Sequence, residues 1–244
     1  MEVCVESVQS AINAENGGAS RIELCANLLE GGTTPSIGML QVIKELVSIP
    51  VFVMIRPRGG DFCYSPPEIQ VMLADIRALK AAGADGFVFG ILTVDGEVDT
   101  VKCKVLLDAV RPHPATFHRA IDMCCDINQA LTRVMDLGFE RVLSSGGCAA
   151  AYEGREVLHT MVLQSQGSKT KVMPGAGITV DNLQEILALS GAGEFHGTAR
   201  ESMESCMKFT KPGLSMGSTT IQITSTKIVQ QLLSIFNSIV NKRN

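Results

Sequence analysis

Carboxylate and imidazole side chains lie within or just after short apolar segments of the sequence, where folding could bring them together. A carboxylate or an imidazole at the right place can carry a proton to or from a bound substrate, and an unperturbed imidazole titrates near neutral pH. Four residues are therefore candidates for acid–base catalysis: Glu6, Glu23, His118 and His196.

A second set of residues could hold an anion. The run from Arg56 to Phe62 (RPRGGDF) joins two arginines to a glycine-rich backbone, and guanidinium and backbone N–H groups both bind oxyanions. Glycine-rich turns hold phosphate in many enzymes, although tight turns need glycine in any case. The candidates for anion or ligand binding are Arg56, Arg58, Arg119, Asp122, Gly175 and Gly177. One hypothesis is thus an enzyme that acts on a small anionic metabolite.

The chain has eight cysteines and no CxxC spacing. Scattered cysteines in a chain of this size are typical of reduced thiols in a cytosolic protein. Cys4 and Cys25 lie in two successive segments with strand character, and two thiolates that meet would suit a soft ion such as Cu(I). Paired buried cysteines are also common as small apolar core residues. Both interpretations remain open at this point.

The elements that must position these residues follow a repeat of helix, glycine, short polar step and apolar strand. Four copies are plain, for example Ala81–Gly83 before 86–90 and Leu137–Gly138 before 141–145. Glycine after a helix supplies the left-handed conformation that ends it. Extending the pattern predicts strands near 2–6, 21–25, 51–56, 86–90, 115–119, 141–145, 171–175 and 194–197. It predicts helices near 8–16, 37–47, 67–81, 100–110, 127–137, 149–165, 180–189 and 226–240.

Eight strands alternating with eight helices predict parallel pairing and a single (β/α)8 TIM barrel over residues 1–244. A doubly wound open sheet is the weaker alternative, because no GxGxxG follows the first strand. Bulky residues set the orientation of each strand. They turn Glu6, Glu23, Cys25, Arg56, His118 and His196 into the barrel mouth, with Cys4 also inward. A purely structural network, with Arg56 locked between Glu6 and Glu23, is the alternative to a functional pocket.

Two C-terminal features depart from the repeat. A long insert near 198–225 is rich in Ser, Thr, Gly and Met. A loop of that length is functional, partly disordered or part of a subunit contact. The last helix carries an apolar face that is wider than one barrel groove needs, which favours burial against a second subunit.

The bulk composition excludes some classes of protein. A net charge of −4 offers no basic face to nucleic acid. No apolar run reaches the ~18 residues that span a bilayer. The sequence opens on a strand-like alternation at Met1, which predicts no signal peptide, although a short leader could have been removed.

Five motifs together resemble the CutC family, which is described as copper homeostasis proteins, and the chain resembles its vertebrate members. The motifs are MEVCVE (1–6), RIELC (21–25), MIRPRGGDF (54–62), TFHRAID (116–122) and GAGI (175–178), and the resemblance extends to about Ala199. It implies a TIM barrel that self-associates into dimers or tetramers, in the cytoplasm and also the nucleus. It also implies a role in copper handling or tolerance, with one Cu(I) per subunit held by Cys4 and Cys25.

Overall fold

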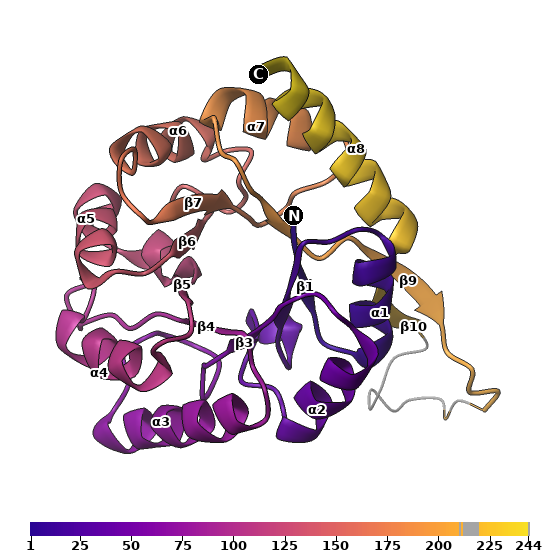
Figure 1. Ribbon diagram of the computed structural model, residues 1–244, viewed down its shortest axis with the longest axis horizontal. Coiled ribbons are helices and arrows are strands. Elements are labelled where there is room, and N and C mark those ends of the chain that lie inside the picture. Colours follow the sequence, from indigo (N-terminus) through magenta and orange to yellow (C-terminus); the bar gives the residue numbers. More distant parts are fainter. Residues whose placement is uncertain (210, 212–219, 244) are drawn as a thin grey trace.

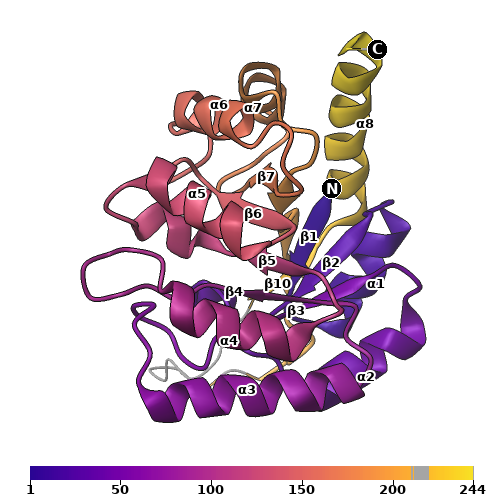
Figure 2. The same cartoon turned by 60° about the vertical axis from the view of Figure 1, so that its left-hand side comes forward.

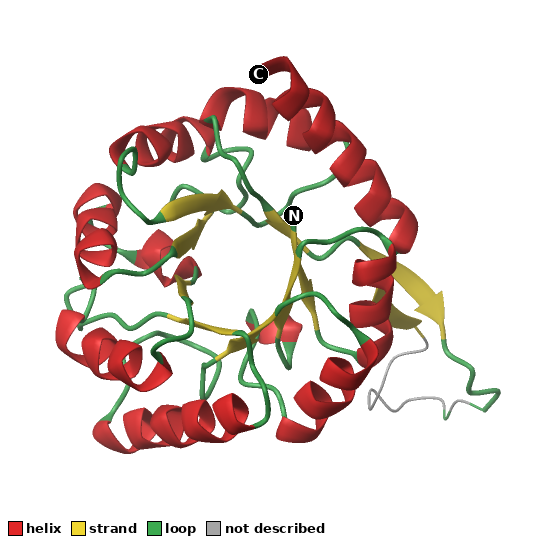
Figure 3. Cartoon of the chain, viewed as in Figure 1, coloured by secondary structure: helices red, strands yellow, loops and turns green. Residues whose placement is uncertain are grey.

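The computed structural model describes residues 1–209, 211 and 220–243, and it confirms the predicted barrel. Eight parallel strands pair in the order β7-β6-β5-β4-β3-β2-β1-β8 and curve into a nearly closed ring inside a layer of helices (Figures 1 and 3). The strands are β1 (Glu2–Val5), β2 (Arg21–Leu24), β3 (Val51–Met54), β4 (Gly86–Phe89), β5 (Ala115–Phe117), β6 (Arg141–Ser144), β7 (Lys171–Pro174) and β8 (His196–Gly197).

The helices lie close to their predicted positions. They are α1 (Val8–Asn16), α2 (Ile37–Leu46), α3 (Pro66–Ala81), α4 (Thr100–Val110), α5 (Ile127–Leu137), α6 (Arg155–Gln164), α7 (Leu183–Ser190) and α8 (Thr226–Arg243). Figure 2 shows them packed side by side outside the strands. Local sequence sets their ends. Ser65 forms a capping box with Glu68 at the start of α3, and Gly138 ends α5 with a left-handed φ of 84°.

Three element boundaries differ from the prediction. Strand β5 ends at Phe117, and residues Arg119–Met123 form a 3-10 helix, η2, whose N-cap is His118. Helices α6 and α7 begin several residues later than the apolar pattern suggested. In each case the turn between strand and helix uses residues that the pattern assigned to an element.

Apolar and polar side chains are divided between the two faces of the strands. The largest fully buried aromatic side chains, Phe87, Phe89, Phe117, Phe139 and Phe195, belong to the main apolar core cluster that includes residues of the surrounding helices. The barrel interior instead carries a small separate cluster of Cys4, Cys25, Phe52, Met54 and Val88 beside charged residues. Strand alternation therefore places the chemistry-bearing residues inside the barrel, as the bulky residues predicted.

An ion-pair network closes the N-terminal end of the barrel. Arg21 pairs with Glu2 and, at 3.1 Å, with Glu194. Arg141 reaches the same Glu194 at 3.0 Å. Residues at this end of a TIM barrel serve stability, because the βα loops that form sites are at the other end.

The segment near 198–225 is in part a β-hairpin rather than a loop. Strand β9 (Arg200–Glu204) pairs antiparallel with β10 (Thr220–Thr224) beside α1 (Figure 1). The predicted insert also includes residues 210 and 212–219, which lie outside the described residues. Backbone hydrogen bonding in the hairpin satisfies groups that an open loop would expose to water.

Helix α8 packs between α1 and α7 of its own chain. Val229 and Leu232 are fully buried there, and Phe236 lies 5.5 Å from Phe195. Much of its apolar face is thus covered within one chain, and the predicted subunit contact stays a prediction. Within the part of the chain that the structure describes, no helix is both long enough and apolar enough to cross a membrane.

Candidate functional site

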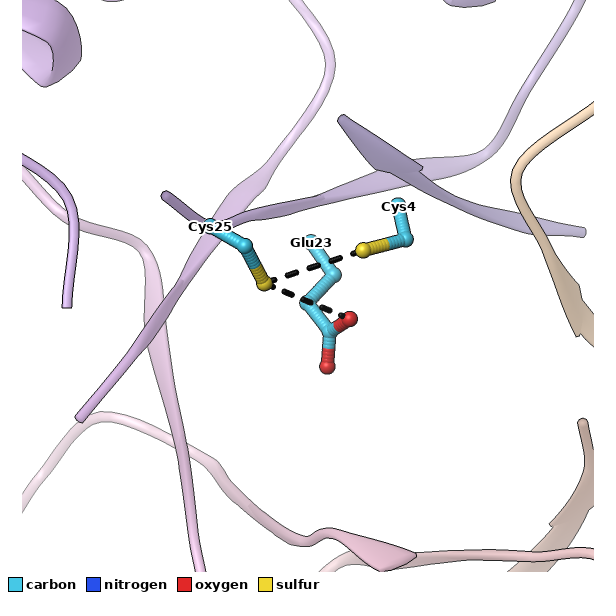
Figure 4. A group of neighbouring side chains, drawn as sticks. All are labelled: Cys4, Glu23 and Cys25. Atoms are coloured by element: carbon cyan, nitrogen blue, oxygen red, sulfur yellow. Dashed lines mark hydrogen bonds between the residues drawn. The ribbon is translucent and has the colours of Figure 1, made fainter. Parts of the chain in front are cut away.

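Two thiols face each other inside the barrel. Cys4 lies on β1, and Cys25 follows the last residue of the neighbouring strand β2. Their sulfurs are 3.7 Å apart, and both residues are buried (Figure 4). The thiol of Cys25 also points to Glu23 Oε2 at 3.7 Å. Register explains the meeting, because Cys4 is the direct partner of Glu23 in the parallel pair, two residues before Cys25.

A histidine between two carboxylates lies next to the thiols. His196 Nδ1 is 2.9 Å from Glu2 Oε1, and His196 Nε2 is 3.5 Å from Glu23 Oε2. Burial lowers the pKa of His196, but the Glu23 charge, a hydrogen bond with Cys4 and the Glu2 carboxylate together outweigh burial and raise that pKa well above its usual value. The imidazole therefore carries a positive charge at neutral pH. It is the counter-ion of two buried carboxylates.

The carboxylates respond to their surroundings in opposite directions. Burial raises the pKa of Glu2, yet hydrogen bonds and charge from His196 and Arg21 lower it to about 2. For Glu23, burial raises the pKa further than His196 lowers it, and the net shift is upward. Glu23 Oε1 has no hydrogen-bond partner among the described residues. It is a buried acceptor that no protein group satisfies.

The two thiols are protonated in the absence of a metal. The hydrogen bond to Cys25 and burial together raise the pKa of Cys4 well above its usual value. The hydrogen bond from Cys4 lowers the pKa of Cys25, but burial and Glu23 raise it to about 11. These thiols are therefore poor nucleophiles at neutral pH. An ion that binds both sulfurs must displace their protons.

The thiol pair fits one soft ion. A metal–sulfur bond is about 2.3 Å long, so two sulfurs on one ion lie at most about 4.6 Å apart. The observed 3.7 Å is within that limit. Cys4, Glu23 and Cys25 form one group whose ligand atoms lie within 4.8 Å of one another, and Glu2, Glu23 and His196 form another. In the second group both imidazole nitrogens face carboxylates, and a metal bound there would have to displace a proton from His196.

A cavity of about 540 Å³ opens at the C-terminal mouth of the barrel. Six of the candidate residues line it together with Cys4: Glu23, Arg56, His118, Arg119, Gly177 and His196. Apolar side chains form much of the remaining wall. A cavity of this size suits a small organic molecule.

Arg56 does not form the ion pairs with Glu6 and Glu23 that the purely structural alternative requires. Its guanidinium donates to three backbone carbonyls, those of Glu30 at 2.6 Å, Gly32 at 2.9 Å and Gly60 at 2.9 Å. Arg56 is only 4% exposed, and among the described residues no carboxylate lies within ion-pair distance of it. The purely structural Glu–Arg network is therefore not what forms here.

His118 presents one ring nitrogen to the cavity without a partner. Its Nδ1 accepts the backbone N–H of Ala120 at 3.2 Å, which caps η2. The proton of the neutral ring is therefore on Nε2, and that atom has no hydrogen-bond partner in the described part of the chain. Burial, followed by the charge of Arg56, lowers the pKa of His118 to about 3. In the unliganded protein His118 is thus a neutral N–H donor at pH 7.

The other predicted anion-binding residues lie elsewhere or are already engaged. Arg58 pairs with Glu68 at 2.5 Å and Asp61 at 3.1 Å and does not line the cavity. Arg119 lines it, but its guanidinium is bound to Asp122 at 2.8 Å. Asp122 in turn accepts hydrogen bonds from the loop after β6, including backbone N–H groups at 3.0 and 3.1 Å. It serves to hold that loop in place.

The remaining predicted residues separate in the same way. Glu6 accepts the backbone N–H of Leu28 at 2.9 Å and does not line the cavity. Gly177 lines it, whereas a Cβ on Gly175 would meet Leu143 at 2.5 Å, which gives that glycine a packing role. Ala176 lines the cavity with a left-handed φ of 79°, a strained conformation typical of functional sites.

Sequence reasoning did not single out two residues of the site. Glu2 holds His196, and Phe62 contacts both Arg56 and His118, with its ring centroid 5.1 Å from the guanidinium carbon and 5.0 Å from the imidazole. The inward orientation of Glu2 on β1 was the available signal for the first. No sequence pattern identifies the second, because Phe62 lies on a loop.

Comparison with known proteins gives a consistent result. The model of the CutC family matches residues 1–201. A mouse protein named copper homeostasis protein cutC homolog is 58% identical over 89% of this chain and 79% of its own length. The human protein of the same name is 53% identical over 98% of this chain and 90% of its own length.

Solved structures show the same fold. The CutC protein of Streptococcus agalactiae superposes with a TM-score of 0.76 at 34% identity, over 81% of this chain and 97% of its own. N-(5′-phosphoribosyl)anthranilate isomerase from Pyrococcus furiosus superposes with a TM-score of 0.59 at 12% identity, over 97% of this chain and 98% of its own. The second likeness concerns the fold alone.

Proposed function

This chain belongs to the CutC family, and from that premise we propose that it binds one Cu(I) per subunit through Cys4 and Cys25 and acts in intracellular copper handling. Copper is here the cargo. The mouse and human relatives are named as copper homeostasis proteins, which supports the choice of metal. The predicted location in the cytoplasm or nucleus and the predicted self-association belong to the same proposal.

The observation that carries the proposal is the facing thiol pair. Two sulfurs 3.7 Å apart on adjacent strands offer a soft, low-coordinate donor set, and Cu(I) accepts such coordination readily. Both cysteines are buried, which limits the access of water and oxygen to the ion. Glu23 offers an oxygen donor 3.7 Å from the Cys25 sulfur. The raised pKa values mean that the ion competes with protons for both sulfurs.

The test is a Cu(I) titration against a competing chelator without oxygen. The wild-type chain is compared with a Cys4→Ser/Cys25→Ser double variant. A matched control, Cys63→Ser/Cys148→Ser, removes two partly exposed thiols that are not part of the pair. We expect the first double variant to lose one tight equivalent, with affinity reduced by at least about tenfold, and the control to keep it. Equal affinities in all three proteins would remove the cysteine assignment.

A further inference from the structure

The cavity at the barrel mouth contains a buried positive charge that no described carboxylate neutralises. Arg56 is 4% exposed, and its three hydrogen-bond acceptors are neutral carbonyls. The nearby Tyr64 does not compensate the charge, because burial raises the pKa of its phenol to about 12. Burying an unpaired charge is costly, and proteins usually offset it with a counter-ion. The missing counter-ion is the first indication of a ligand.

Unsatisfied donors that line the same cavity are the second indication. The Nε atom of Arg56 and the Nε2 atom of His118 are both buried and have no partner in the part of the chain that the structure describes. Both side chains line this cavity and contact Phe62, which lines it as well. Buried polar groups are nearly always hydrogen-bonded, and each exception calls for an explanation. An oxygen acceptor that enters from the cavity would satisfy both.

From these observations we propose that the barrel mouth binds a small organic carboxylate, whose oxygens accept hydrogen bonds from Arg56 and His118. One unpaired buried cation and one neutral N–H donor match a single negative charge. Arg119 is already paired with Asp122, and Arg200 is partly exposed, so water solvates its charge. Among the described residues of the lining, Arg56 is thus the only buried arginine without a carboxylate partner, which favours a monoanion over a phosphate dianion.

The rest of the cavity determines the body of the ligand. Met54, Phe62, Leu143, Ile178 and Val180 line it, so the carbon part of the ligand is apolar and contacts these side chains. Glu23 and His196, which form an ion pair, also line the cavity. The negative charge of Glu23 repels a ligand carboxylate. That repulsion orients the carboxylate toward Arg56 and His118. This ligand site goes beyond copper binding, and the two groups proposed to bind the carboxylate, Arg56 and His118, include neither cysteine.

The test uses three probes with one aromatic body and different head groups: phenylacetate, its neutral amide phenylacetamide, and phenyl phosphate. Binding to the full chain is measured by calorimetry and by ligand-observed NMR. We expect phenylacetate to bind at least tenfold more tightly than the other two. Absence of phenylacetate binding, or equal binding of the amide, would overturn the proposal. Tighter binding of phenyl phosphate would overturn the assignment to a monoanion.

Variants locate the site. His118→Asn keeps an oxygen that can accept the Ala120 N–H but removes the donor at Nε2, and Arg56→Gln removes the charge. Each should weaken phenylacetate binding at least tenfold, while Arg58→Gln, a charge loss on the same loop outside the cavity, should leave it unchanged. Wild-type affinity in the first two variants would refute the site. If Arg56→Gln does not fold, as shown by circular dichroism, His118→Asn decides alone.

The single variant Cys25→Ser separates this proposal from copper binding, because Cys25 is not among the residues that line the cavity. It should keep the wild-type affinity for phenylacetate while losing tight Cu(I). Loss of phenylacetate binding in that protein would place the carboxylate on the thiol pair and overturn the assignment to Arg56 and His118. Failure of the copper titration alone would leave the phenylacetate result standing.

Discussion

Replacing His118 with asparagine is expected to make the protein less sensitive to mild acid. In the folded protein, burial and the charge of Arg56 lower the pKa of His118 to about 3, whereas the unfolded chain titrates near 6.5. As the pH falls from 6.5 toward 3, the unfolded state takes up a proton at this residue and the folded state does not. Stability is therefore lost as the pH falls through that window, and no such loss occurs above it.

The expected magnitude follows from the size of the shift. One unit of pKa difference corresponds to about 1.4 kcal/mol, so between about pH 7.5 and about pH 5 the free energy of unfolding should fall by about 2 kcal/mol at this residue. Only part of the full difference appears in this range, because His118 becomes fully protonated in the folded state only below pH 3. Stopping at pH 5 keeps most carboxylates of the unfolded chain ionised.

The assay is urea unfolding followed by far-ultraviolet circular dichroism, since the chain has no Trp. Wild type and His118→Asn are compared at each pH. Buried groups such as His196 and Glu23 titrate in both proteins, so the difference between the two profiles isolates His118. Asparagine retains an acceptor for the N-cap of η2 and does not titrate. Parallel profiles for the two proteins would refute the assignment of His118 as a buried neutral imidazole.

Three further predictions concern the thiol pair and the packing around the cavity. Cu(I) affinity should rise with pH, because protons must leave both thiols; a chelator competition that is flat from about pH 6.5 to 8 would contradict this. Glu23→Gln should lower the thiol pKa values, seen as thiolate absorbance at lower pH, since the carboxylate raises them. Gly90→Ala should lower the free energy of unfolding in urea by about 1–3 kcal/mol, because the added Cβ would lie 2.7 Å from His118 Nδ1. The control Gly193→Ala should leave the stability unchanged, because the Cβ added there meets no atom within 4 Å.

The sequence predicted the barrel well, because strands that alternate with helices along the chain must pair in parallel. Strand alternation also predicted that Cys4, Glu23 and His196 point inward, because the bulky neighbours of each residue determine which face it occupies. The sequence did not predict where β5 ends and η2 begins. A polar residue after a strand can either extend that strand or cap the following helix, and the sequence does not distinguish the two. His118 does the second.

The sequence does not predict which groups each inward side chain pairs with. Alternation places Arg56 inside the mouth but does not say whether carboxylates or carbonyls surround its guanidinium. That choice depends on the path of the loops containing Glu30, Gly32 and Gly60. The network of Glu6, Glu23 and Arg56 therefore stayed open as the alternative to a functional pocket, because the sequence does not give the path of those loops. The ionisation of His118 depends on the same loops.

The soft thiols favour a metal ion and the hard polar groups of the mouth favour an anion, and the two sets occupy different parts of the barrel interior. The thiol pair is on β1 and at the end of β2, while Arg56 and His118 follow β3 and β5 and share Phe62. Glu23 is the link between them, because it contacts the Cys25 thiol and also lines the cavity. An ion that neutralises Glu23 would remove the repulsion that a carboxylate meets there. Occupancy of the thiol pair and of the cavity should therefore be positively coupled, and by linkage each ligand should raise the affinity for the other by the same factor.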